Sequence, residues 1–298
     1  MSVSPYDTLT TLHRLPLGWW LLAFGLFSFA QGLLVWRWRL YLGWLGASPP
    51  WQASLLVYLQ GWALLFTPAR SGEAVRVRLL SRRCGVPAAI GLAALLAERC
   101  TGLTAALLLL GLGLAGSNRW ALLAVAVSGA LLLWLFTHPK ALDRAQSRLP
   151  HSPQGPLAFL GRLMAMALRA LAHCRQLLTP EALTIGILLA LGAWLLESFL
   201  VWSLWQAVGG PAESCPGLLA AAVVRVSLGL GAVLSLLPAG LGVADGTALG
   251  MALLVGVSTP LALTTLVVLR LFSVALPLAV GGLAWWVAPP GQTAHHKD

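Results

Sequence analysis

The chain has 298 residues, of which 58% are hydrophobic and only 9% are charged. Soluble domains carry about a quarter charged residues, so this composition excludes a soluble protein and indicates one transmembrane domain over residues 1–298. The net charge is +10, but the basic residues flank apolar segments or lie inside them. We therefore expect them to set membrane orientation and contact anionic lipids, with no nucleic-acid partner. Neither the cysteines nor the histidines have metal-ligand spacing, so no metal and no cofactor are expected.

The first part of the chain begins with an apolar segment at residues 17–36, which is long enough to span a membrane. Arg37-Trp38-Arg39 follows and is typical of an interface anchor, before a loop at 40–50. The next apolar stretch, residues 51–66, is shorter than the ~20 residues of a spanning helix and ends at a proline. Beyond that break, a polar helix with five arginines is predicted at residues 70–83.

The rest of the chain contains four more long apolar segments and a second break. Residues 86–115 form a predicted span with Glu98-Arg99 near its middle. Further spans are predicted at residues 120–137, 183–207 and 261–287. Between the last two lie an apolar stretch, a glycine-rich break and a short apolar piece, at residues 218–237, 238–246 and 247–257.

The same membrane pattern occurs twice, in repeat 1 (about 17–115) and repeat 2 (about 183–287). Pro50 recurs 166 residues later, Pro68 recurs 170 residues later, and Arg99 recurs 171 residues later. Ordered matches with so small a drift make chance the minority explanation. Two such units, each interrupted by proline, glycine and an acidic residue, are typical of transporters that build one site with two exits.

Each repeat contains a short, broken apolar stretch, which we interpret as a helix hairpin that enters and leaves the membrane on one side. Irregular backbone at membrane depth is tolerated only where protein buries it or where it lines a wet cavity. With both hairpins re-entrant, five full spans remain and the repeats have opposite orientation. We therefore predict an all-α polytopic membrane protein with two inverted repeats. If both stretches cross fully, the chain has seven spans and parallel repeats, and that alternative stays open.

The basic residues favour the re-entrant arrangement. It places Arg37, Arg39, Arg82, Arg83 and Lys297 on one side together with the arginine-rich connector, and the positive-inside rule makes that side cytoplasmic. The connector, residues 119–180, contains the 120–137 span and an amphipathic helix at 157–178. That helix is expected to lie in the cytoplasmic interface, either as a plain connector or as a lipid sensor.

Charged residues inside apolar segments are costly, so each is a candidate functional residue. In the first hairpin, Glu73 lies three residues from both Arg70 and Arg76, so its carboxylate can sit between two guanidinium groups. Arginine forks suit phosphate, because they bind its oxygens bidentately. We expect Arg82 and Arg83 only to set topology, and the role of Arg78 stays open.

The second hairpin has a glycine-rich break. Gly240 and Gly242 permit unusual backbone angles and the close approach of a head group. Asp245 opens the next helix, where it can be an N-cap, a cavity residue, or both.

Other charges lie inside the predicted spans. Arg99 and Arg270 occupy equivalent places in the two repeats, and Gln31 is the counterpart of Glu197. We expect Glu98 to pair with Arg70 or Arg76, and Asp245 to pair with Arg225 or Arg270. Purely structural ion pairing is an alternative of equal weight.

The two break motifs resemble those of a known family. Pro-Ala-Arg-Ser-Gly-Glu-x-x-Arg at 68–76, with Gly-Val at 85–86 and Glu-Arg at 98–99, resembles one motif of the lysylphosphatidylglycerol synthase transmembrane-region family. Pro-Ala-Gly-Leu-Gly-Val-Ala-Asp-Gly at 238–246, with Gly-Val at 256–257 and Arg270, resembles the other. Two departures are mild, since Ala69 replaces a glycine and Asp245 replaces a glutamate. The resemblance covers about residues 15–288.

This resemblance implies the lipid-flippase activity of the transmembrane domain of the bacterial multiple peptide resistance factor. Without a soluble aminoacyl-transferase domain, it implies lipid translocation in a bacterial inner membrane and not lysyl-lipid synthesis. The ligand would be an anionic or aminoacylated phospholipid, or a polyprenyl-phosphate-linked lipid, and its phosphate would contact the arginines.

Two alternatives remain open beside the flippase. One is an enzyme that transfers a sugar or another group from a polyprenyl-phosphate lipid, with Glu73 or Asp245 as the base. The other is a non-catalytic subunit of a lipid-modifying complex. A second copy of the chain and a lipid-modifying enzyme are the protein partners to consider.

Overall fold

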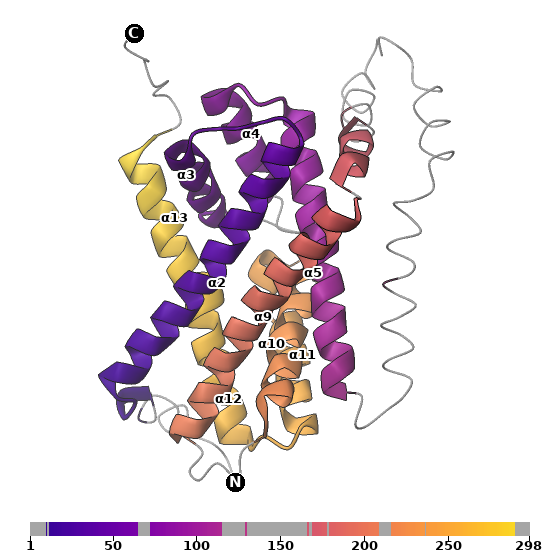
Figure 1. The fold of residues 1–298 in the computed structure, drawn as a ribbon. Coiled ribbons are helices and arrows are strands. Elements are labelled where there is room, and N and C mark those ends of the chain that lie inside the picture. The colour runs from indigo at the N-terminus through magenta and orange to yellow at the C-terminus, as the bar shows by residue number, and fades with distance from the viewer. Residues whose placement is uncertain are drawn as a thin grey trace.

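The structure, a computed structural model, describes residues 10, 12–64, 72–114, 129, 166, 169–177, 179–208, 216–235 and 237–289. Every regular element within these residues is helical, which confirms the all-α prediction (Figure 1). The predicted first repeat contains α2 (Leu17–Trp44), α3 (Trp51–Trp62), α4 (Gly72–Cys84) and α5 (Ala88–Leu114). After the short helix η2 (Arg175–Leu177), the second repeat contains α9 (Pro180–Val208), α10 (Leu218–Leu234), η4 (Pro238–Gly240), α11 (Val243–Leu254), α12 (Thr259–Arg270), η5 (Leu271–Ala275) and α13 (Leu276–Val287).

Four helices are long and apolar enough to cross a membrane. They are α2, α5, α9 and the continuous helix Thr259–Val287, with 28, 27, 29 and 29 residues. Each exceeds the ~20 residues that a spanning helix needs. These helices correspond to four of the five predicted spans, and the fifth, at 120–137, lies outside the described residues. The chain is therefore a polytopic membrane protein.

Helix α2 continues two turns beyond the predicted end at residue 36, so the predicted loop at 40–50 is mostly helix. No proline interrupts the segment before Pro49, and the helix ends where Gly46 adopts a positive φ of 78°. Trp38, Tyr41 and Leu42 are almost fully buried, in an apolar core shared with α3, α4 and α5. The prediction that Arg37 is an interface anchor is therefore wrong, because this packing draws Arg37 into the protein, where it is only 6% exposed.

Two helix hairpins occupy opposite halves of the molecule. The α3–α4 hairpin lies in the half that holds the C-terminal end of α13, and the α10–α11 hairpin lies in the other half (Figure 1). The hairpin helices have 12, 13, 17 and 12 residues, fewer than a full span needs. This is the disposition that re-entrant hairpins in inverted repeats require. The symmetry relation between the repeats itself stays a prediction.

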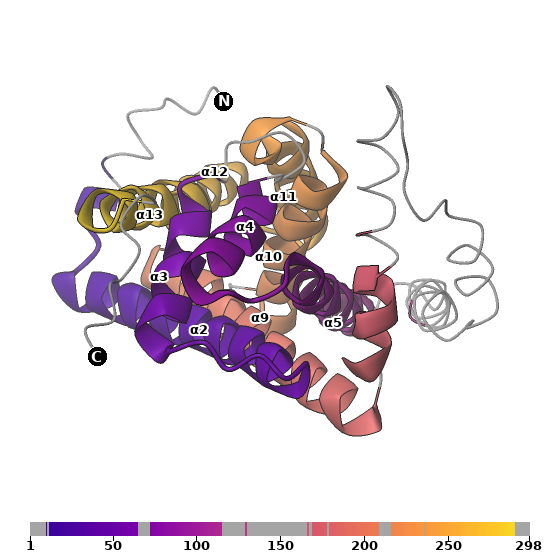
Figure 2. The ribbon, with the colours of Figure 1, turned by 90° about the horizontal axis from the view of Figure 1, so that it is seen from above.

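Each hairpin packs in its own apolar core and also contacts the other repeat. One core joins α2, α3, α4 and α5, and another joins α9, α10, α11 and α12. Across the repeats, α3 packs against α13 and α10 packs against α5, while α2 lies along α9 (Figure 2). The two predicted repeats therefore interlock, and their hairpins face the centre of the bundle.

The glycine-rich break has the unusual backbone that its sequence predicts. Gly240 and Gly242 have φ values of 70° and 81°. A Cβ on Gly240 would lie 2.7 Å from the Cα of Ala232, so this position requires glycine for space as well. Ala239 also has a positive φ, 52°, although only the glycines of this segment were expected to adopt such a conformation. Helix α11 begins at Val243, four residues earlier than the predicted 247, so Asp245 lies inside its first turn.

Only the C-terminal end of the predicted amphipathic helix lies within the described residues, and the amphipathic character of the whole helix stays a prediction. Within residues 169–177, which are helical, Ala170, Cys174 and Leu177 are buried in the core of the first repeat. Arg169 is exposed. This end of the connector therefore packs on protein, and residues 157–168 of the predicted helix lie outside the described residues.

The contact between α3 and α13 generates a stability prediction. A Cβ on Gly281 would lie 2.3 Å from the backbone nitrogen of Ala63, whereas a Cβ on the adjacent Gly282 would meet nothing within 4 Å. Gly281→Ala should therefore force the helices apart and destabilise the protein by about 1–3 kcal/mol. Gly282→Ala should leave stability unchanged or raise it, since alanine favours helix by about 1 kcal/mol. Thermal unfolding in detergent measures both, and equal melting temperatures for the two variants would contradict this packing.

Candidate functional site

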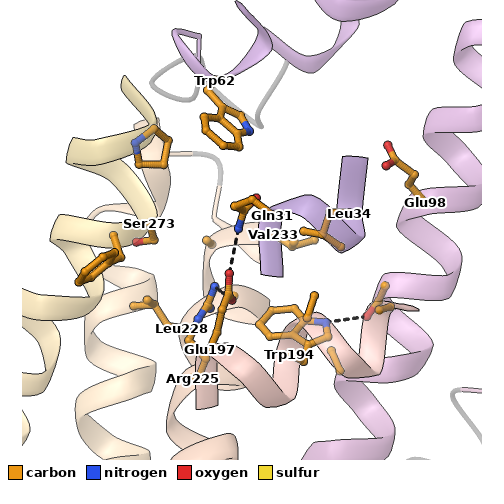
Figure 3. Close-up of a pocket in the computed structure, with 18 of the residues that line it drawn as sticks. Gln31, Leu34, Trp62, Glu98, Trp194, Glu197, Arg225, Leu228, Val233 and Ser273 are labelled. Carbon is orange, nitrogen blue, oxygen red and sulfur yellow. Dashed lines mark hydrogen bonds and ion pairs between the residues drawn. The ribbon is translucent and has the colours of Figure 1, made fainter. Parts of the chain in front are cut away.

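A cavity of about 250 Å³ with charged side chains in its wall lies at the centre of the bundle, where both hairpins meet the long helices. Its walls come from α2, α3, α4, α5, α9, α10, η4, α12 and η5, and α13 contributes Pro277. Part of its lining is shown in Figure 3. The cavity is smaller than a site for a drug-sized molecule, so it fits a head group and not a whole lipid. Its polar lining consists of Gln31, Arg37, Tyr58, Trp62, Arg76, Glu98, Arg99, Trp194, Glu197, Arg225, Arg270 and Ser273.

Arg76 and Glu98 form a buried ion pair between the first hairpin and α5. Both side chains are 7% exposed. The guanidinium group of Arg76 also lies over the ring of Trp38, 3.9 Å from its centroid, and 4.7 Å from that of Tyr58. A cation held by a carboxylate and two aromatic rings is well compensated for its burial. Of the two predicted partners for Glu98, the structure thus places Arg76 against it.

Arg225 and Glu197 form a second pair, between α10 and α9, in which Glu197 is buried and Arg225 is partly buried. Gln31 extends it, because its Nε2 donates a hydrogen bond of 3.0 Å to Glu197 Oε1 (Figure 3). Arg225 lies 4.8 Å from the ring centroid of Trp194, whose Nε1 donates to the carbonyl of Gly102 at 3.3 Å. The sequence identified Gln31 and Glu197 as equivalent positions, and the structure shows that the two bond to each other.

Arg270 and Asp245 form the third pair, which links α12 to α11. Arg270 Nε lies 2.6 Å from Asp245 Oδ1, and one terminal nitrogen lies 2.7 Å from Oδ2, so the contact is bidentate. The other terminal nitrogen donates to the carbonyl of Ala239 at 2.8 Å. The backbone N–H of Gly242, the N-cap residue, donates to Asp245 Oδ2 at 3.0 Å. Asp245 is thus the third residue of the helix and not its N-cap, and with Arg270 it fixes the break.

The predicted site residues have different outcomes. Within the described residues, five of them line the cavity: Arg76, Glu98, Arg99, Arg225 and Arg270. Asp245 adjoins it through Arg270, and Gly240 supplies a carbonyl 3.4 Å from that guanidinium. Gly242 only caps α11. Arg70 lies outside the described residues, and so does the side chain of Glu73.

The structure also places three arginines that were not among the predicted site residues. Arg82, expected only to set topology, is exposed, and so is Arg78, whose role was open. Arg37 lines the cavity although the sequence analysis assigned it to the interface. The signal for it was present, because Phe27, Gln31, Leu34 and Arg37 follow a 4-3-3 spacing that puts them on one helical face.

The arrangement suits anion binding better than bond-making chemistry. Five arginines and two glutamates line the cavity, and Asp245 adds a third carboxylate beside Arg270. The three carboxylates each hold one arginine, so the described site has more cationic than anionic groups. Within the part of the chain that the structure describes, no three His, Cys, Asp or Glu side chains come together as metal ligands would.

The Arg76–Glu98 pair generates a second prediction. Glu98→Gln should lower the free energy of unfolding by about 3–5 kcal/mol, because it leaves a buried guanidinium without a counter-charge. The double variant Arg76→Met/Glu98→Gln should recover much of that loss, since neither buried charge remains. Thermal or denaturant unfolding in detergent measures the coupling. If the stability losses of the single variants Arg76→Met and Glu98→Gln simply add in the double variant, the two side chains are not coupled.

Comparison with known proteins agrees with this architecture. Residues 2–281 match the family model described as the lysylphosphatidylglycerol synthase TM region. No curated protein shows a significant match to the chain. The matched range includes both hairpins and every residue that lines the cavity. The chain therefore belongs to the lysylphosphatidylglycerol synthase transmembrane-region family.

Proposed function

We propose that this protein is a lipid flippase or transporter that moves a phosphate-bearing lipid between the leaflets of a bacterial inner membrane. The observation that carries the proposal is the arginine-rich cavity between two hairpins that lie in opposite halves of the molecule. Charges are rare inside membrane proteins and mark substrate pathways. An anionic or aminoacylated phospholipid or a polyprenyl-phosphate-linked lipid fits these charges, and membership of the family supports a lipid-related role.

The cavity suggests how translocation would work. The lipid phosphate would enter among the arginines while its acyl chains stay in the bilayer, because the cavity holds only a head group. Each hairpin would cover the cavity from one side, so that small movements of one hairpin open it to one leaflet. The π-helix η5 directly after Arg270 interrupts the regular helix beside the cavity, and such interruptions are frequent at functional sites.

The orientation follows from the basic helix ends. The C-terminal ends of α2 and α4 and the N-terminal end of α9 lie at one end of the molecule (Figure 1). In the sequence these helix ends carry or adjoin Arg39, Arg82, Arg83 and Arg175. The positive-inside rule makes this end cytoplasmic. The first hairpin then opens toward the cytoplasm, and the second opens toward the opposite side.

The state of the three carboxylates that the structure describes at the site favours transport over group transfer, and the side chain of Glu73, the other candidate base, lies outside the described residues. A general base must be free to take a proton from its substrate. Glu98, Glu197 and Asp245 are each bound to an arginine instead. These carboxylates are better suited to hold the arginines in place.

A leaflet-accessibility assay in proteoliposomes tests the proposal, with fluorescent anionic, aminoacylated and zwitterionic lipids. Arg76→Ala should abolish protein-dependent movement, because it removes a cavity guanidinium. Arg82→Ala is the matched control, since it removes the same charge from an exposed position of the same helix. Normal transport by well-folded Arg76→Ala protein would contradict the phosphate-binding role.

The same assay separates the alternatives. The charge-neutral variant Arg76→Met/Glu98→Gln provides a second test if Arg76→Ala unfolds, and it too should fail to move lipid. If wild-type protein moves no lipid but forms a glycolipid product in detergent, the protein is a group transferase. If it does neither and needs only its surface helices for function, it is a subunit of a complex.

A further inference from the structure

Arg37 differs in its surroundings from Arg76, Arg225 and Arg270, the cavity arginines that are paired with carboxylates. It is only 6% exposed and lines the cavity together with Gln31 and Leu34 on the same face of α2. One terminal nitrogen donates a long hydrogen bond, 3.4 Å, to Thr101 Oγ1. Its Nε is buried and has no hydrogen-bond partner. A guanidinium group has five N–H donors, so most of the donors of Arg37 have no partner among the described residues.

The missing partner is a counter-charge. Arg76, Arg225 and Arg270 each have a carboxylate of their own. None of the carboxylates whose side chains the structure describes lies at ion-pair distance from Arg37. A buried charge without a partner is strongly destabilising. Such a cost at a cavity wall is expected where an anionic ligand supplies the missing charge.

The space beside Arg37 is kept open by its neighbours. The hydroxyl of Thr101 already has other partners. It donates to the carbonyl of Ala97 at 2.8 Å, and the hydroxyl of Tyr41 lies 2.9 Å from its oxygen. Gly102 has no side chain, and a Cβ there would touch both terminal nitrogens of Arg37, at 3.8 and 3.9 Å. Arg37 therefore lines the cavity with donors that the described residues leave unused.

We propose that Arg37 is the residue that binds the phosphodiester group of a glycerophospholipid in the cavity. A phosphodiester carries one negative charge, which matches one guanidinium without a counter-ion, and two of its oxygens fit the guanidinium fork. The volume of the cavity admits this group without the acyl chains. The inference rests on the proposed lipid transport, and it names the contact that selects the phosphate.

Binding to the full chain in detergent tests the inference by native mass spectrometry. The probes are short-chain phosphatidylglycerol and the diacylglycerol with the same chains, which lacks the phosphate. The wild type should bind the phospholipid about tenfold or more tightly than the diacylglycerol, because hydrogen bonds between charged groups stabilise the complex. Arg37→Gln should lose most of this preference, and Arg37→Lys should keep part of it because it retains the charge without the fork. Arg39→Gln, two residues along α2, should behave as wild type, since Arg39 bonds the carbonyl of Pro49 outside the cavity.

Thermal unfolding without added lipid gives an independent readout. Arg37→Gln should be at least as stable as the wild type, because it removes an uncompensated buried charge. A lower melting temperature with an unchanged lipid preference would overturn the inference and make Arg37 a structural residue. Inorganic phosphate serves as a competing probe. If phosphate displaced the phospholipid at equal concentration, the ligand would be free phosphate and the inference would be wrong.

The inference and the proposed function fail in different ways. If the wild type moves lipid and Arg37→Gln keeps the full phosphate preference, the inference is wrong and the transport proposal stands. If the preference depends on Arg37 but no lipid moves, Arg37 binds the phosphodiester and the transport proposal is wrong.

Discussion

The structure depends on the pairing of guanidinium groups with carboxylates inside a membrane. Removing a charge from water costs several kcal/mol unless a partner is in place. The three described Arg–carboxylate pairs meet this cost, and each ties a hairpin helix to a long helix: α4 to α5, α10 to α9, and α11 to α12. Charge pairing therefore does two things at once, because it allows arginines into the cavity and holds both hairpins against the spanning helices.

The hairpin ends pose a related problem. A helix that stops at membrane depth leaves backbone carbonyls and N–H groups without partners, and these must be satisfied within the protein. In the second hairpin, Arg270 bonds the carbonyls of Ala239 and Gly240, and Asp245 accepts the N–H of Gly242. The same side chains thus stabilise the break and border the cavity. A head-group phosphate that engages these arginines would act on the elements that close the cavity, which connects binding with opening.

Much of this architecture could be predicted from the sequence because its determinants are local. Apolar length identified α2, α5, α9 and the last long helix, and proline and glycine identified the two breaks. Arg37 was misassigned because Arg-Trp-Arg after an apolar run looks the same at a membrane interface and inside a longer helix, and only the burial of Trp38 and Tyr41 distinguishes them. The Arg225–Glu197 pair was missed for a similar reason, since it depends on how α9 packs against α10. Helix α11 begins early because Gly242 and Asp245 cap it, a local signal that the apolar pattern does not carry.

The central claim is that a wet, charged cavity exists at membrane depth between the hairpins, and thiol reactivity tests it most directly. Val233→Cys and Leu234→Cys would be made in a variant whose four native cysteines are serine, and treated in liposomes with a water-soluble thiol reagent. Val233 lines the cavity, whereas its neighbour Leu234 does not, although it is 80% exposed. Thiols react in water and not in lipid, because the thiolate is the reactive form. With a water-filled cavity, Val233→Cys should be modified rapidly and Leu234→Cys only slightly. Modification of neither, or of Leu234→Cys alone, would contradict the claim.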